Sequence, residues 1–212
     1  MSLIMLGVYA LVGVVHQVAA LSFWNVARGV TKCLLMPVLV AYYCIRADGP
    51  LVVAILAIVF SWLGDAILLG KNNPNIFRLG MAAFLLSHAF YIATLIGLTH
   101  RWNIPVLIIS IIVALAAEIA LPRIIKPPPG MRIPILVYGV AILAMSICAL
   151  QYALSTPSAP SIALFVGSLI FIFSDALLAY LSFGRKPKYF NAITMPPYII
   201  AQVLIVIGLA LA

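Results

Sequence analysis

Long apolar stretches alternate with short polar breaks along this chain. A helix needs about 20 largely apolar residues to cross a bilayer, within a range of roughly 17–25. Stretches of this length cover residues 3–22, 29–45, 51–69, 76–98, 104–121, 133–154, 161–183 and 192–211. The pattern therefore predicts eight transmembrane helices.

The breaks between the stretches contain residues that end helices and form turns. They include Asp48-Gly49-Pro50, Asn72-Asn73-Pro74 and the run from Pro127 to Gly130. Because the breaks are short, consecutive helices are expected to run antiparallel. Pro196 and Pro197 are expected in the first turn of the last helix, where their fixed φ fits. We predict an all-α membrane protein, a compact bundle of about eight helices that forms a single domain over residues 1–212.

The composition excludes most other classes of protein. Hydrophobic residues make up 66% of the 212 residues and charged residues 8%, against about 45–50% and about 25% in soluble domains. A soluble globule, a disordered tail and a nucleic-acid-binding module are all excluded. The N-terminal stretch has no basic residues before it, so we interpret it as the first spanning helix and not as a signal peptide.

The positive charges lie mostly on one side of the predicted bundle. Two cations, Arg46 and Arg101, follow even-numbered segments, and ten follow odd-numbered ones: Arg28, Lys32, Lys71, Arg78, Arg123, Lys126, Arg132, Arg185, Lys186 and Lys188. Short cytoplasmic loops are enriched in Lys and Arg. We therefore predict that both termini face away from the cytoplasm. The short loops favour a bacterial inner membrane, with an internal eukaryotic membrane as the alternative.

Two of the four acidic residues, Asp65 and Asp175, lie inside apolar segments. An ionisable group near the bilayer centre costs at least about 2.5–3.5 kcal/mol, so such residues are candidates for function. The alternating helix directions place both aspartates in cytoplasmic halves. The polar residues Lys32, Glu118, Tyr138, Tyr198 and Gln202 share that depth, while His16 and His88 lie nearer the middle. This arrangement predicts a polar pocket open to the cytoplasmic leaflet.

Helical spacing suggests how some of these side chains interact. Ser61 lies four residues before Asp65 and could hydrogen-bond its carboxylate. Tyr91 shares part of a face with His88, and Tyr198 shares one with Gln202. The alternative is structural: each aspartate pairs with a cation or a tyrosine to lock helix packing. We interpret His16 and His100 as structural, and an interfacial position accounts for Glu118.

Motifs for metal or cofactor chemistry are missing from the sequence. Its three histidines and three cysteines show no metal-ligand spacing. It has no GxSxG elbow, no HExxH pair and no glycine-rich phosphate loop. We therefore predict a protein that uses no metal and no cofactor.

Six sequence blocks follow one another in a recognisable order. They are Thr31 to Pro37, Gly64-Asp65, Phe84 through Tyr91, Tyr138 through Met145, Phe165 to Asp175, and Tyr198 through Gln202. In this order they resemble the YhhN-type lysoplasmalogenase family of multi-pass membrane proteins. The resemblance covers nearly the whole chain. It departs at Cys33, where the family more often has proline.

The resemblance implies hydrolysis of the vinyl ether bond of lysoplasmalogens, which are lysophospholipids taken from the bilayer. The products would be a fatty aldehyde and glycerophosphocholine or glycerophosphoethanolamine. It also implies that Asp65 and Asp175 are catalytic. Seven further residues are then expected to bind substrate: Lys32, Ser61, His88, Tyr91, Tyr138, Tyr198 and Gln202.

Two carboxyls in different environments suit this chemistry, as in glycoside hydrolysis. We hypothesise that one aspartate, kept protonated by apolar surroundings, supplies a proton, while the other stabilises the resulting cation and orients water. The sequence leaves open which aspartate has which role. The competing class is a transporter or lipid-moving protein whose aspartates carry protons or bind a cation. A third class is a purely structural membrane protein.

Overall fold

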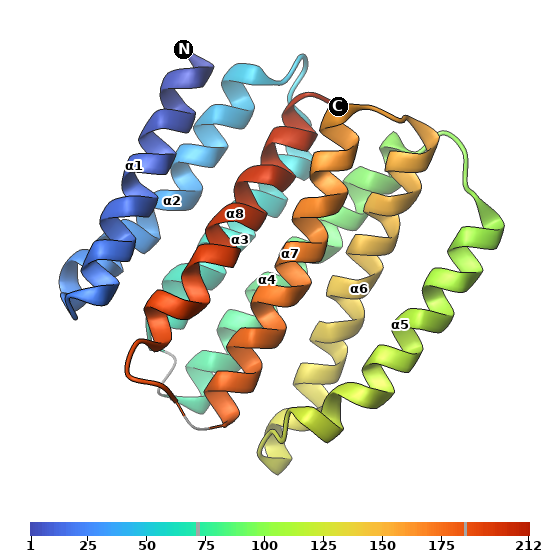
Figure 1. Ribbon diagram of the computed structural model, residues 1–212. Coiled ribbons are helices and arrows are strands. Elements are labelled where there is room, and N and C mark those ends of the chain that lie inside the picture. The colour runs from blue at the N-terminus through green and yellow to red at the C-terminus, as the bar shows by residue number, and fades with distance from the viewer. Residues whose placement is uncertain (71–72, 185) are drawn as a thin grey trace.

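The computed structural model describes residues 1–70, 73–184 and 186–212 of the chain (Figure 1). Its elements are α1 (Ser2–Leu21), α2 (Asn25–Arg46), α3 (Val52–Ile67), η1 (Leu68–Gly70), α4 (Pro74–Leu98), α5 (Ile104–Ile124), η2 (Pro129–Met131), α6 (Arg132–Ser155), α7 (Ala159–Phe183) and α8 (Phe190–Ala210). Within the described ranges, eight helices are long and apolar enough to cross a membrane. The prediction of an all-α membrane bundle is confirmed, and the protein is an integral multi-pass membrane protein.

Polar residues in the breaks between the apolar stretches begin several helices through side-chain caps. Asn73 accepts a hydrogen bond from the backbone of Asn75, and Asn103 accepts one from Val106. Ser158 and Ser161 form a capping box at the start of α7. Each cap satisfies backbone N–H groups that have no partner within the helix. Lys71, Asn72 and Arg185, which contributed to the predicted loops and charges, lie outside the described residues.

The prediction that Pro196 and Pro197 open the last helix is wrong. Helix α8 already begins at Phe190, so both prolines lie in its interior. A proline has no N–H, and Pro196 therefore leaves the carbonyl of Ala192 without its usual partner. The Gln17 amide nitrogen of α1 donates to this carbonyl at 2.6 Å. A neighbouring helix thus supplies the hydrogen bond, as membrane bundles often do.

The helices form two central pairs with helices on either flank (Figure 1). In the view of Figure 1, α7 and α8 lie in front of α3 and α4, α1 and α2 form one flank, and α6 and α5 form the other. Both termini lie at the same end of the bundle. Helix α5 packs against α6 and has no buried residue among those described, so most of its surface is left to lipid.

Helices α7 and α8 approach each other closely at glycines. A Cβ atom added at Gly167 would lie 2.9 Å from the backbone nitrogen of Ile205 and 3.0 Å from the carbonyl oxygen of Ala201. Small residues allow this approach, which is how membrane helices gain packing without a hydrophobic driving force.

We therefore expect Gly167→Ala to lower the free energy of unfolding by about 1–3 kcal/mol, because backbone atoms must move apart. Gly7→Ala is the matched control, since a Cβ there meets nothing within 4 Å. Thermal unfolding of both purified variants in detergent measures the effect. Equal unfolding temperatures would show that α7 and α8 are not packed this closely.

Candidate active site

A cavity of about 340 Å³ lies among the helices, and residues from all eight of them line it. It is near the end of the bundle opposite the chain termini, because its lining includes Arg28 near the start of α2 and Asn191 near the start of α8, and both helices begin at that end. Its volume is within the range of ligand sites, which is about 300–1,000 Å³. The polar lining residues include His16, Arg28, Lys32, Asp65, Glu118, Tyr138, Asp175, Lys186, Asn191 and Tyr198.

Apolar side chains cover the rest of the cavity wall. They come mainly from α4, α6 and α7, together with η1, and include Leu68, Met81, Phe84, Ile142, Leu143 and Ile172. A site that joins a few polar groups to an extended apolar wall matches an amphiphile with a polar head and a hydrocarbon chain. The predicted polar pocket is therefore present at one end of the bundle.

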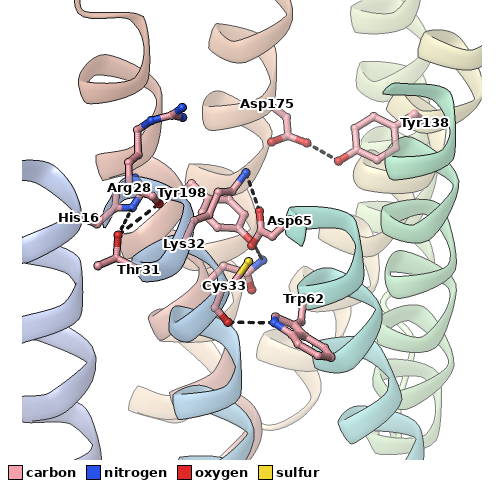
Figure 2. A network of polar contacts seen from close by, with 11 residues as sticks. His16, Arg28, Thr31, Lys32, Cys33, Trp62, Asp65, Tyr138, Asp175 and Tyr198 are labelled. Atoms are coloured by element: carbon pink, nitrogen blue, oxygen red, sulfur yellow. Dashed lines mark hydrogen bonds and ion pairs between the residues drawn. The ribbon is translucent and has the colours of Figure 1, made fainter. Parts of the chain in front are cut away.

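Asp65 is fixed by partners from two other helices (Figure 2). The Lys32 ammonium lies 3.0 Å from Oδ1. The Tyr198 hydroxyl donates to Oδ2 at 2.5 Å and accepts from the Gln202 amide at 3.2 Å. The Asp65 side chain is 2% exposed and that of Lys32 is 14% exposed. A carboxylate this buried requires a cation and hydrogen-bond donors, and it has both.

Asp175 has different surroundings. Its side chain is half-buried, and its Oδ2 atom accepts a hydrogen bond from the Tyr138 hydroxyl of α6 (Figure 2). Among the described residues, no cation forms an ion pair with Asp175 and no hydrogen bond reaches its Oδ1 atom. Among the described residues, the two aspartates of the cavity therefore differ: Asp65 is paired with a cation and Asp175 is not.

Aromatic and indole contacts hold the Asp65 network in place. The Trp62 indole donates to the carbonyl of Cys33 at 2.9 Å, which ties α3 to α2 beside Asp65 and Lys32 (Figure 2). The Tyr198 ring packs against Phe84 and Phe171, with centroids 6.4 and 5.8 Å away. These contacts restrict the orientation of the Tyr198 hydroxyl.

The structure brings five of the nine predicted site residues together around the cavity: Lys32, Asp65, Tyr138, Asp175 and Tyr198. Gln202 lies behind Tyr198 and contacts its hydroxyl. His88 lies behind Tyr138, with ring centroids 5.5 Å apart, and its Nδ1 donates to the carbonyl of Phe84 at 2.6 Å. Tyr91 is also buried away from the cavity.

The predicted hydrogen bond between Ser61 and Asp65 is wrong. Ser61 Oγ lies 2.7 Å from Ser87 Oγ, and the Ser87 hydroxyl donates to the carbonyl of Ala57. The proton of Ser61 is therefore directed to Ser87 on α4. Helical spacing places two residues on one face but does not identify which neighbouring helix covers that face.

Sequence reasoning missed several cavity residues. The sequence alone indicates only loop cations at Arg28 and Lys186 and a structural role for His16, and it does not single out Asn191, yet all four line the cavity. Glu118 also lines it, and its Oε2 atom is buried with no hydrogen-bond partner among the described residues. Knowledge of which helices pack against each other would have identified these cavity residues, but the hydrophobic pattern does not give that information.

The structure also shows how potential metal-binding side chains are distributed. Within the part of the chain that it describes, no three His, Cys, Asp or Glu side chains gather as a possible metal site. The expectation that the protein uses no metal and no cofactor stays a prediction.

A known protein family matches most of the chain. The YhhN family matches residues 27–209. The chain belongs to the YhhN family. Every residue of the Asp65 and Asp175 networks described above lies within this YhhN region.

A curated relative of this YhhN protein is the lysoplasmalogenase TMEM86B of Mus musculus. The two are 29% identical over 152 residues, which is 72% of this chain and 61% of the relative. The matched region therefore spans less than two thirds of the relative's length. No solved structure matches this chain.

Proposed function

We propose that this YhhN-family protein hydrolyses the vinyl ether bond of lysoplasmalogens. The products are a fatty aldehyde and glycerophosphocholine or glycerophosphoethanolamine. One observation carries the proposal: two carboxyls in unlike surroundings, Asp65 and Asp175, line one cavity among membrane-spanning helices. Similarity to a protein named lysoplasmalogenase supports the choice of substrate.

Asp175 is assigned the role of general acid. A vinyl ether reacts by accepting a proton at the carbon β to its oxygen, which gives an oxocarbenium ion. Among the residues that the structure describes, Asp175 has no paired cation to keep it ionised, and Tyr138 occupies its Oδ2 atom, so Oδ1 is left to carry the proton. Transfer from Oδ1 to the β carbon leaves Asp175 as a carboxylate.

Asp65 is assigned the role of the fixed anion. Lys32 and Tyr198 hold its carboxylate in one orientation, so it can stabilise the developing cation without rearrangement. Water then adds to the cationic carbon and returns a proton to Asp175. The hemiacetal formed transfers its hydroxyl proton to the glycerol oxygen as the carbon–oxygen bond breaks, releasing aldehyde and alcohol.

Cavity residues also account for binding of the rest of the lipid. Arg28, Lys32 and Lys186 are cations on the cavity wall and suit the phosphate group. Once the phosphate shares the Lys32 ammonium, more of the negative charge of Asp65 is available to the reacting carbon. The hydrocarbon chain lies against the apolar wall that includes Phe84 and Ile142.

Assay of the purified protein in detergent tests the proposal. Incubation with 1-alkenyl lysophosphatidylcholine is expected to release free fatty aldehyde, measured by coupled reduction. The matched substrate is the 1-alkyl analogue, which has no double bond to protonate and is expected to stay intact. A carrier or scaffold would release no aldehyde from either lipid, and that result would overturn the proposed activity.

A further inference from the structure

One buried group on the cavity wall takes no part in the mechanism above. His16 of α1 is fully buried and lines the cavity. Its Nε2 atom has no hydrogen-bond partner among the described residues. Leaving a buried polar atom unpaired costs about 1–3 kcal/mol. An unpaired ring nitrogen on a residue that lines a ligand cavity points to a ligand atom that would pair with it.

The hydrogen bonds of Thr31 indicate which ring nitrogen of His16 carries the hydrogen. The Thr31 hydroxyl donates to the carbonyl of Ala27 at 2.7 Å, and the same oxygen lies 2.9 Å from His16 Nδ1. The hydroxyl has one proton, and the two carbonyls within its reach, of Ala27 at 2.7 Å and of Arg28 at 3.2 Å, can only accept it, so we assign Thr31 as the acceptor from His16. Nδ1 therefore carries the hydrogen, and Nε2 presents a lone pair. His16, a residue of the cavity wall, thus has a fixed hydrogen-bond acceptor that needs a donor.

The charged residues around His16 determine which kind of hydrogen-bond donor suits Nε2. Figure 2 shows His16 beside Thr31 and Arg28, with Lys32 and Tyr198 between it and Asp65. Two cations on this wall disfavour a positively charged donor such as an ammonium group. An uncharged hydroxyl avoids that repulsion and satisfies Nε2.

We propose that His16 Nε2 accepts a hydrogen bond from the sn-2 hydroxyl of the lysolipid and thereby selects lipids that are not acylated at sn-2. This inference rests on the proposed function. With the sn-3 phosphate at Arg28 and Lys32 and the sn-1 vinyl ether at the two carboxyls, the central glycerol carbon faces the wall that contains His16. A lipid acylated at sn-2 has no donor there and would leave Nε2 unpaired.

The test combines two substrates with three variants of the full chain. The substrates are 1-alkenyl lysophosphatidylcholine and its 2-deoxy analogue, which differ by the sn-2 hydroxyl alone. The variants are His16→Phe, which keeps a ring but removes the acceptor, His16→Gln, which supplies an amide oxygen, and His88→Phe. His88 is the matched control because it is equally buried but lies outside the cavity lining.

The wild-type protein is expected to prefer the hydroxyl substrate by about 10- to 100-fold in kcat/KM, because the analogue leaves a buried acceptor unpaired. His16→Phe is expected to abolish this preference, and His16→Gln to restore part of it. His88→Phe is expected to change both substrates by the same factor. A merely structural role for His16 would also lower both rates equally.

Two results would overturn the proposal while leaving the proposed function intact. One is a wild-type protein that releases aldehyde equally fast from both substrates. The other is a His16→Phe variant that keeps the wild-type preference. If the wild-type protein releases aldehyde from neither substrate, the proposed function fails and the assignment of His16 fails with it.

Discussion

Replacing Asp175 by Asn is expected to lower kcat for aldehyde release by at least about 100-fold, because general acid catalysis contributes roughly 10²–10⁴-fold. Asparagine cannot supply a proton to the vinyl ether. Its amide oxygen still accepts the hydrogen bond that Tyr138 donates to Asp175. No ion pair is lost among the described residues, so the fold is expected to remain intact.

The measurement is single-turnover aldehyde release by the purified variant, with its unfolding temperature as a check on structure. Glu118→Gln is the matched control, since Glu118 is another carboxyl of the cavity wall that has no part in the proposed mechanism. It is expected to keep most of the wild-type rate. Near-normal turnover by Asp175→Asn would show that the general acid is another group.

The sequence predicts the eight spans and the depth of the polar residues because both depend on position along the helix axis. Alternating helix directions correctly place Asp65 and Asp175 at one end of the bundle. The contact between Tyr198 and Gln202 also follows from their spacing of one turn. The spacing of residues along a helix and the alternating direction of the helices are sufficient to predict these features.

The sides on which the helices meet could not be predicted in the same way. In lipid, both the buried and the exposed faces of a helix are apolar, so hydrophobicity does not mark the inward face. This is why Ser61 was assigned to Asp65 and not to Ser87, and why His16 was not assigned to the cavity. Packing of the other helices decided both cases.

The ion pair between Lys32 and Asp65 allows the structural and chemical roles of an intramembrane aspartate to be separated. Lys32→Met is expected to lower the free energy of unfolding by about 3–5 kcal/mol, because it leaves a buried carboxylate unpaired. Asp65 is 2% exposed and cannot regain hydration. Asp65→Asn is expected to cost less, since the long Lys32 side chain, which is 14% exposed, can carry its ammonium toward water.

The double variant Lys32→Met/Asp65→Asn removes both charges while keeping an acceptor for Tyr198. It is expected to unfold at a higher temperature than Lys32→Met alone and yet to release no measurable aldehyde. If the pair only locks α2 against α3, regained stability would bring regained activity. Thermal unfolding in detergent, measured alongside aldehyde release for all four proteins, decides between these outcomes. If Lys32→Met, which leaves Asp65 without its cation, does not change the unfolding temperature, that result contradicts the buried ion pair itself.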